Sequence, residues 1–233
     1  MNLSKTGEAK DAKAGALYLV KWAIEYASST GDSWSFEQVV RREIMDMLTE
    51  KGIPHCVVDA CRFGVGQQRR RLIAGSEDFV RGVAARMAMD PPAITTVQDV
   101  LPPRGTHMRN RVYTTSELVA PGTRTLVPAT VESQLRTLDK PSWTVTGNSP
   151  PRWYDCHTGT TRYLTIREMA TLQGFPPSYR FDVPTTVRKR SVMVGNAVPP
   201  PVIYAGLCGV RGKTPALLPR SSSGDGRGGQ TRR

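Results

Sequence analysis

Three consecutive arginines, Arg69–Arg71, stand directly before the apolar run Leu72–Ala74. The apolar run predicts a buried strand, so the arginines lie at its N-terminal end. Because side chains alternate between the two faces of a strand, Arg69 and Arg71 are expected on one face and Arg70 on the other. A run of like charge is commonly a solvated surface. Its place at the end of a buried strand leaves a second interpretation, in which the run also faces a pocket.

The pattern around this run alternates between helices and strands. Apolar residues at helical spacing predict a helix within 14–29, and a second helix is predicted over 41–52, where Gly52 supplies the C-terminal stop. Short apolar runs at 33–40, 54–60 and 71–75 predict strands. This order predicts an α/β fold, a sheet flanked by helices.

The α/β pattern stops near Ser76 and gives way to a Pro-, Thr- and Arg-rich stretch with short, weak strands such as 123–129 and 142–147. A helix returns at 165–174, with Thr165 and Glu168 as a capping box and Gly174 as its stop. A turn and then a helix with prolines in its first turn are predicted within 191–210. These shifts divide the chain into a partial α/β domain (1–79), an irregular β-rich region (80–161), a returning segment (162–211) and a disordered basic tail (212–233).

The formal net charge of +12 favours an anionic partner, most simply nucleic acid. The four cysteines form no CxxC pair, and a zinc set drawn from His55, Cys56, Cys156 and His157 is far less favoured than ordinary packing, so no metal is expected. No signal peptide or membrane-spanning apolar run is recognised. We therefore expect a soluble intracellular protein, of the cytoplasm or nucleus, with no membrane partner.

Three segments, in this order, resemble the last three motifs of the cytosine-C5 DNA methyltransferases. FGVGQQRRR (63–71) is similar to the family's aromatic-Gly-Val-Pro-Gln-x-Arg-x-Arg, with Gly66 in place of the proline. RYLTIREMATLQGFP (162–176) and GNAVPP (195–200) are similar to the other two. Upstream, Glu37-Gln38-Val39 resembles the family's Glu-Asn-Val, with glutamine in place of asparagine. The resemblance covers about residues 16–206 and implies the later part of a Rossmann-like, S-adenosylmethionine-dependent methyltransferase domain.

The resemblance also implies roles for individual residues. Negative charge develops on a cytosine ring when a thiolate adds to C6, so Glu37 would hold N3 and N4 and Arg71 would stabilise O2 of a flipped base. Arg69 would tie down the catalytic loop or a phosphate, and Glu25 is a weaker rival to Glu37. Asn196 and Ala197 are expected at the methionine end of the cofactor, S-adenosylmethionine.

In the family, the region between the arginine motif and RYLTIRE recognises the target in double-stranded DNA. Phosphate contacts position a duplex and base-edge contacts specify a site, and the candidates for such contacts are Arg104, Arg109, Arg111, Arg124 and Arg136. The structural roles are expected of Gln67, Arg167, Glu168, Gln173 and Gly195.

The family's Phe-x-Gly-x-Gly cofactor loop and its Pro-Cys nucleophile have no counterpart, because no cysteine follows a proline. We therefore expect an N-terminal methyltransferase subunit or fragment as a partner. A parallel sheet cut between strands would leave an open edge and an uncovered apolar face, and the chain alone would be marginally stable. Three interpretations stay open: a split enzyme, a truncated and inactive gene product, and a DNA-binding module that lost its chemistry. An RNA substrate is a further alternative.

Overall fold

The computed structural model describes residues 18–89, 94–110, 134–181 and 186–214, and the backbone alone of 116–120 and 123–127. A helix over residues 18–29 opens the described part. The further elements are β1 (Ser35–Gln38), α2 (Arg42–Glu50), β2 (His55–Asp59), η1 (Ala60–Phe63), β3 (Arg70–Gly75), α3 (Glu77–Ala88), α4 (Val97–Val100), β4 (His107–Arg109), β5 (Ser116–Ala120), β6 (Thr123–Val127), β7 (Leu135–Thr137), β8 (Arg152–Tyr154), β9 (Thr161–Tyr163), α5 (Ile166–Leu172), α6 (Val187–Asn196) and α7 (Pro200–Val210).

The first sheet has the order β1-β3-β2, and β3 runs antiparallel to both neighbours. Its central strand is buried on both faces, since Leu72 and Ala74 pack into one core cluster and Ile73 into another. The predicted α/β fold class is confirmed. The expectation of a parallel sheet is wrong for the described strands: only β1 and β2 share a direction, and the reversed β3 separates them.

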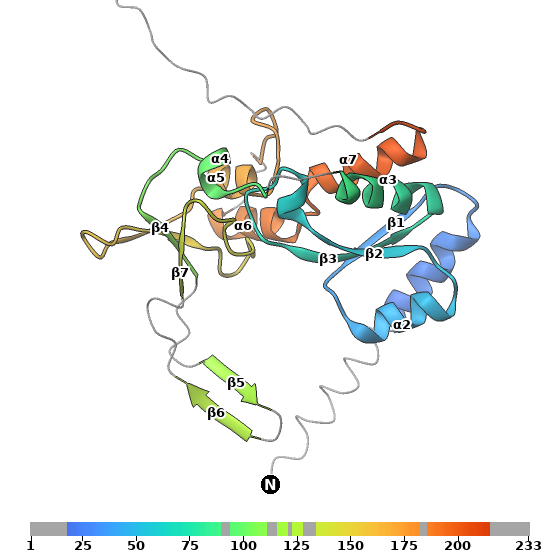
Figure 1. Ribbon diagram of the computed structural model, residues 1–233, viewed down its shortest axis with the longest axis horizontal. Coiled ribbons are helices and arrows are strands. Elements are labelled where there is room, and N and C mark those ends of the chain that lie inside the picture. The colour runs from blue at the N-terminus through green and yellow to red at the C-terminus, as the bar shows by residue number, and fades with distance from the viewer. Residues whose placement is uncertain are drawn as a thin grey trace, which may run out of the picture.

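Helices cover both faces of this sheet (Figure 1). The helix 18–29 and α2 lie on one face, while α3 and α7 lie on the other and pack closely together. Their contact depends on glycine, because a Cβ atom on Gly82 would lie 2.4 Å from the carbonyl oxygen of Ala205. The prediction that the α/β pattern stops near Ser76 is wrong, since α3 continues it and the predicted boundary at 79/80 falls inside that helix. The division of the chain into domains stays a prediction.

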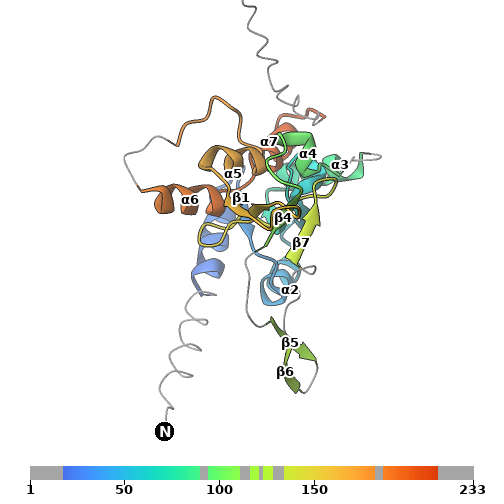
Figure 2. The same cartoon turned by 90° about the vertical axis from the view of Figure 1, so that its left-hand side faces the viewer.

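The second sheet has the order β7-β4-β8-β9, with antiparallel neighbours throughout. Met108 and Trp153, opposite each other on β4 and β8, point into a core that they share with α4, α5 and α6. Figure 1 shows α4, α5 and α6 to the right of β4, and Figure 2 shows α5 and α6 on one side of β4 with α4 above it. The predicted strand at 123–129 appears as β6, paired with β5. The predicted strand at 142–147 is wrong: it makes only an isolated bridge, between Ser142 and Gln67.

Helix ends follow the expected chemistry at four places. Gly52, with φ +64°, follows the last turn of α2, and Gly174, with φ +85°, follows that of α5. The capping box of Thr165 and Glu168 is formed as predicted. The prolines at 200 and 201 occupy the first turn of α7. The turn predicted before α7 is wrong in extent, because residues 191–196 belong to α6.

Residues 187–210 are long and apolar enough to cross a membrane by length and composition. This differs from the expectation that no such run is present. The segment comprises two helices that are interrupted between Ala197 and Pro199. The buried Val194 of α6 packs into the core of the second sheet, and Val202 and Ala205 of α7 pack against the first.

Candidate active site

Glu37 and Arg71 form an ion pair on the first sheet. Glu37 lies opposite Ile73 in the β1–β3 register, so Arg71, two residues before Ile73, is its diagonal neighbour on the same face. Arg71 Nε lies 2.8 Å from Glu37 Oε1, and each side chain is 15% exposed. Oε1 is buried but receives no hydrogen bond from any described residue, so the contact is one of charges without a directed N–H. This carboxylate oxygen, paired by charge with Arg71, therefore still has the capacity to accept a hydrogen bond.

The pair borders a narrow crevice beneath the start of α7. Arg69 also lines it, together with apolar side chains of β2, β3 and α7 and the loop residues Val198 and Pro199. Apolar walls raise the strength of any charge interaction inside the crevice by excluding water. The crevice thus joins all three predicted catalytic residues to the segment that follows Asn196 and Ala197.

Arg69 is almost completely buried, at 3% exposure. Its Nη1 donates to the carbonyl of Val145 at 3.2 Å, and its Nη2 donates to the carbonyl of Ala197 at 3.3 Å. Burial, followed by the charge of Arg71, lowers its pKa to about 10, and Glu37 opposes that shift. Arg69 therefore ties two backbone segments together from inside the protein, and Arg71 presents its charge to the crevice. Arg70, as predicted, is exposed on the opposite side of the strand.

Gln67 and Gln173 are both fully buried and link all three motif segments. Gln67 Nε2 donates to Gln173 Oε1 and, at 3.2 Å, to the carbonyl of Leu172. Gln67 Oε1 accepts from the backbone N–H of Val145 at 2.7 Å. Gln173 Nε2 in turn donates to the carbonyl of Ala197 at 2.5 Å. Buried polar groups need such partners, so this network places the three segments relative to one another.

The end of α6 carries the predicted cofactor residues. Asn196 is exposed and Ala197 is half-buried. Gly195, just before them, lies against the loop at Gly147, where a Cβ atom would come within 2.1 Å of the Gly147 nitrogen. The absence of a side chain at Gly195 therefore brings α6 into direct backbone contact with the 142–147 segment. The amide of Asn196 is left free to meet a ligand on the exposed side.

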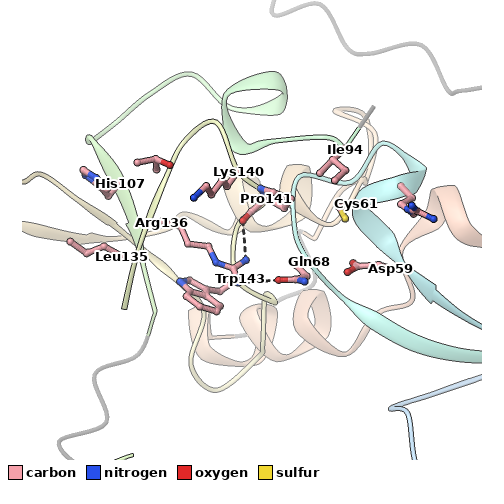
Figure 3. Close-up of a pocket in the computed structure, with 12 residues that line it drawn as sticks. Asp59, Cys61, Gln68, Ile94, His107, Leu135, Arg136, Lys140, Pro141 and Trp143 are labelled. Atoms are coloured by element: carbon pink, nitrogen blue, oxygen red, sulfur yellow. Dashed lines mark hydrogen bonds between the residues drawn. The ribbon is translucent and has the colours of Figure 1, made fainter. Parts of the chain in front are cut away.

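A larger pocket of about 760 Å³ lies between the two sheets (Figure 3). Arg136 stands at its centre, where Nη2 donates to Gln68 Oε1 at 2.9 Å and Nη1 donates to the carbonyl of Pro141 at 3.2 Å. Its guanidinium also stacks on Trp143, 3.4 Å from the ring centroid. Burial lowers the pKa of Arg136. This predicted DNA-binding residue is thus held by the protein itself and shapes the pocket wall.

Of the other arginines predicted to bind DNA, the side chains of Arg104 and Arg109 are described. Arg104 is exposed, and Arg109 lies on β4 with its guanidinium over the ring of Tyr154. Arg111 lies outside the described residues. Only the backbone of Arg124 is described, in β6 opposite Val119.

Arg167 and Glu168 bind groups around α5. Arg167 donates to the carbonyls of Pro176 and Tyr179, at 3.4 and 2.9 Å. Glu168 completes the capping box and accepts from Trp153 Nε1 at 3.1 Å and from Arg162 Nη2 at 2.7 Å. Burial acts to raise the pKa of Glu168, but the hydrogen bonds from Arg162 and Thr165 outweigh it and the pKa is lowered. Both residues fasten the helix, and neither lines the crevice or the larger pocket.

Two of the cysteines are poorly suited to attack an electrophile. Burial raises the pKa of Cys56 to about 11, and burial together with Asp59 raises that of Cys61 to about 12. A thiolate is the nucleophilic form, and these environments disfavour it. Among the described residues, one set of side chains lies close enough together to hold a metal ion. It consists of the consecutive residues Asp155, Cys156 and His157, at an exposed turn. His55 and Cys56 are not part of that group.

Sequence reasoning missed Trp143 and Val145, which hold Arg136 and Arg69. The signal that marks them is a tryptophan two residues after Pro141, in a segment otherwise short of apolar residues. The rival carboxylate Glu25 lies on the surface of the helix 18–29, paired with Lys51 at 2.8 Å, and touches neither pocket.

Comparison with known proteins gives the following matches. A family model described as C-5 cytosine-specific DNA methylase matches residues 38–207, so that Glu37 lies one residue before the matched range. DNA (cytosine-5)-methyltransferase 1A of Oryza sativa subsp. japonica is 47% identical over 49 residues, which are 21% of this chain and 3% of that protein. Type II methyltransferase M.Bpa9945I of Bacillus paralicheniformis is 54% identical over 39 residues, 17% of this chain and 8% of that protein. Among solved structures, the S. pombe Dnmt2 methyltransferase is similar with a TM-score of 0.46 and 14% identity, over 79% of this chain and 68% of that one.

Proposed function

Since the chain belongs to the C-5 cytosine-specific DNA methylase family, we propose that it forms the part of a DNA (cytosine-5-)-methyltransferase that holds a flipped cytosine and closes the cofactor pocket. The observation that carries this proposal is the Glu37–Arg71 pair at the crevice, with a buried carboxylate oxygen that receives no hydrogen bond from the described residues. A base with its N4 amino group at that oxygen would supply the missing donor.

Glu37 and Arg71 would contact different atoms of the cytosine ring. The Glu37 carboxyl group would hold N3 and the amino group at N4, and Arg71 would face O2. Both contacts stabilise the negative charge that develops when a thiolate adds to C6, and this charge makes C5 nucleophilic. Arg69 would act on the substrate only indirectly, because its guanidinium is bound to the carbonyls of Val145 and Ala197.

S-adenosylmethionine would supply the electrophilic methyl group when bound. The residues at the end of α6 fit one wall of its site, since the exposed amide of Asn196 can accept from the ammonium and donate to the carboxylate of the methionine end. Gly195 and the bonds that Arg69 and Gln173 make to the Ala197 carbonyl would hold this wall in position.

The attacking thiolate would come from a Pro-Cys segment outside the sequence in hand, in another chain or in another part of a longer protein. Two features support such a partner. β1 stands at the end of its sheet in the described part of the chain, with its outer edge open. The helix 18–29 exposes Tyr18, Trp22 and Tyr26, and the last two rings stack 5.6 Å apart. An open strand edge and exposed aromatic rings are both features that further strands and helices would cover.

The matched segments span only 3% to 8% of the curated relatives named above, so the activity of the whole protein is part of this proposal. A DNA-binding module without chemistry is the second candidate, and the raised thiol pKa values of Cys56 and Cys61 favour it. The two candidates differ in whether a fragment that carries the nucleophile restores methyl transfer.

The test is transfer of labelled methyl groups from S-adenosylmethionine to DNA of mixed sequence. The purified chain is assayed alone and together with a fragment that bears the cofactor loop and the Pro-Cys. We expect activity only in the mixture, and its loss with Arg71→Ala. Activity of the chain alone would overturn the need for a partner. Inactivity of the mixture, with DNA binding intact, would favour the binding module. Methylation of a matched RNA in place of DNA would correct the substrate.

A further inference from the structure

The turn that joins β8 to β9 gathers three side chains of the kinds that bind metals. Asp155, Cys156 and His157 follow directly after Tyr154, the last residue of β8. Their ligand atoms, a carboxylate oxygen, the thiol sulfur and a ring nitrogen, all lie within 4.8 Å of one another. Consecutive side chains of a strand alternate between its two faces, so three in a row can meet only where the chain turns. The turn therefore brings together a set that a strand would keep apart.

Hydrogen bonds to the backbone hold this turn in shape. Asp155 Oδ1 accepts from the N–H of His157 at 2.9 Å, and the N–H of Asp155 donates to the carbonyl of Thr160 at 3.0 Å. Thr106, just before β4, accepts from the N–H of Cys156 at 2.9 Å through its Oγ1. The backbone N–H of each of the three residues is thus engaged. The backbone is fixed, while the exposed side chains of Cys156 and His157 can still rotate.

The separations between the ligand atoms suit a small tetrahedral ion. Around zinc, with bonds of about 2.0–2.3 Å, neighbouring ligand atoms lie about 3.3–3.6 Å apart. The separations of up to 4.8 Å at this turn therefore exceed that spacing by at most about 1.5 Å, which is within reach of rotation about the bonds of the exposed side chains. A carboxylate offers about four lone-pair positions, so Asp155 can hold the N–H of His157 and an ion at the same time.

The mixture of ligand types selects the kind of metal. Thiolate and imidazole are ligands of zinc and related transition metals, whereas calcium and magnesium prefer oxygen. A thiolate and a carboxylate together carry two negative charges, which match a divalent cation. The sequence alone disfavours Cys156 and His157 as half of a zinc set with His55 and Cys56, but the structure brings Asp155 to them instead. Three protein ligands leave the fourth position of a tetrahedral site to water.

We propose that Asp155, Cys156 and His157 form a zinc site with water as the fourth ligand. The ion orders the β8–β9 turn and, through the bond between Thr106 and Cys156, the contact of that turn with the segment before β4. Because the ligands are consecutive in the chain, the ion stiffens one turn and does not join distant segments. The three residues line neither the crevice beneath α7 nor the larger pocket. Zinc binding at the turn requires no methyl transfer, so this inference is independent of the proposed function.

The test is calorimetric titration of Zn²⁺ into the full chain, after bound metal has been removed with a chelator. We expect one zinc ion per chain. Cys156→Ser should weaken binding by more than about 100-fold, which is the upper limit for the loss of a mere outer partner of a ligand. Asp155→Asn and His157→Gln each remove one ligand and should also weaken binding. The matched control is His55→Gln/Cys56→Ser, which removes an adjacent histidine and cysteine from β2 and should leave the affinity for zinc unchanged.

Co²⁺ serves as the spectroscopic probe, because a cobalt–thiolate bond gives a charge-transfer band in the near ultraviolet. The band should appear with the parent chain and be absent from Cys156→Ser, while circular dichroism confirms that both are folded. Zinc should also slow the reaction of Cys156 with iodoacetamide and leave that of the buried Cys61 unchanged. Three results would each overturn the proposal: parent and Cys156→Ser bind zinc equally well, two chains share one ion, or the control at β2 loses zinc binding.

Discussion

Gln67 and Gln173 meet in the solvent-free interior, 106 residues apart in the sequence, and the amide of one donates to the amide of the other. Each then reaches one more segment: Gln67 accepts from the N–H of Val145, and Gln173 donates to the carbonyl of Ala197. The pair therefore determines how the strand that carries Arg71 lies relative to the end of α6. Both glutamines are structural residues that act on the site through the backbone.

Replacement of Gln67 by methionine should lower the free energy of unfolding by about 2 kcal/mol, because the side chain keeps its size but leaves the buried Val145 N–H without an acceptor. Urea denaturation followed by circular dichroism measures this change. Gln98→Met, on the exposed surface of α4, is the matched control and should leave stability near the parent value. Equal stability of the two variants would show that the amide network adds nothing to the fold.

A side chain at Gly195 should also destabilise the protein. The Cβ atom of Gly195→Ala would meet the backbone of Thr146 and Gly147, which cannot turn aside as a side chain can. We expect a loss of about 3 kcal/mol, at the upper end of overpacking effects. Thermal denaturation compares it with Met193→Ala, an exposed position on the same helix. A variant as stable as the control would mean that α6 can move away from the loop at no cost.

The sequence predicts elements best where local chemistry decides them. The capping box at Thr165 and Glu168, the stops at Gly52 and Gly174 and the α/β class follow from spacing and residue type alone. Helix α3 was missed because its apolar face is short and because Gly82, at its contact with α7, counts against a helix in a local pattern.

The candidate site was predictable only where local sequence patterns determine it. The motif supplies Arg71, and strand alternation correctly separates it from Arg70. The burial of Arg69 and the engagement of Arg136 with Trp143 and Gln68 depend on segments that lie far apart in the sequence. No local pattern reveals such partners, so a basic residue in a recognition region looks like a DNA contact until its neighbours are known.

The burial of Cys56 and Cys61 should lower the reactivity of their thiols and should make the stability of the fold depend on pH. The pKa of Cys61 is raised from 9.0 to about 12 and that of Cys56 to about 11. In the folded protein both thiols stay protonated above pH 9, where the unfolded chain loses these protons. The contribution of the two thiols to the free energy of unfolding is therefore fully present below pH 9. It is lost as the pH rises from 9 towards 11 and 12.

Alkylation with iodoacetamide at pH 8, followed by mass spectrometry, should modify the exposed Cys156 first and Cys61 much later. The variant Cys56→Ala/Cys61→Ala should flatten the decline in stability above pH 9 relative to the parent. Rapid labelling of Cys61 in the native state would contradict its burial and would reopen the question of a nucleophile in this chain.

The sharpest test of the crevice compares two glutamates that differ in position alone. The side chain of Glu37 is 15% exposed and paired with Arg71, and Glu25 lies on the surface, paired with Lys51. Glu37→Gln removes the carboxyl group that would give its proton to N3 as negative charge develops on the ring, so methyl transfer by the complemented enzyme should fall by about 10²–10³ in kcat. Glu25→Gln removes the same charge from the same half of the protein and should leave kcat unchanged. The readout is single-turnover methyl transfer at saturating DNA, which separates chemistry from binding. If the two variants are equally active, Glu37 does not hold the base; if both are inactive, net charge or complementation is at fault and not the crevice.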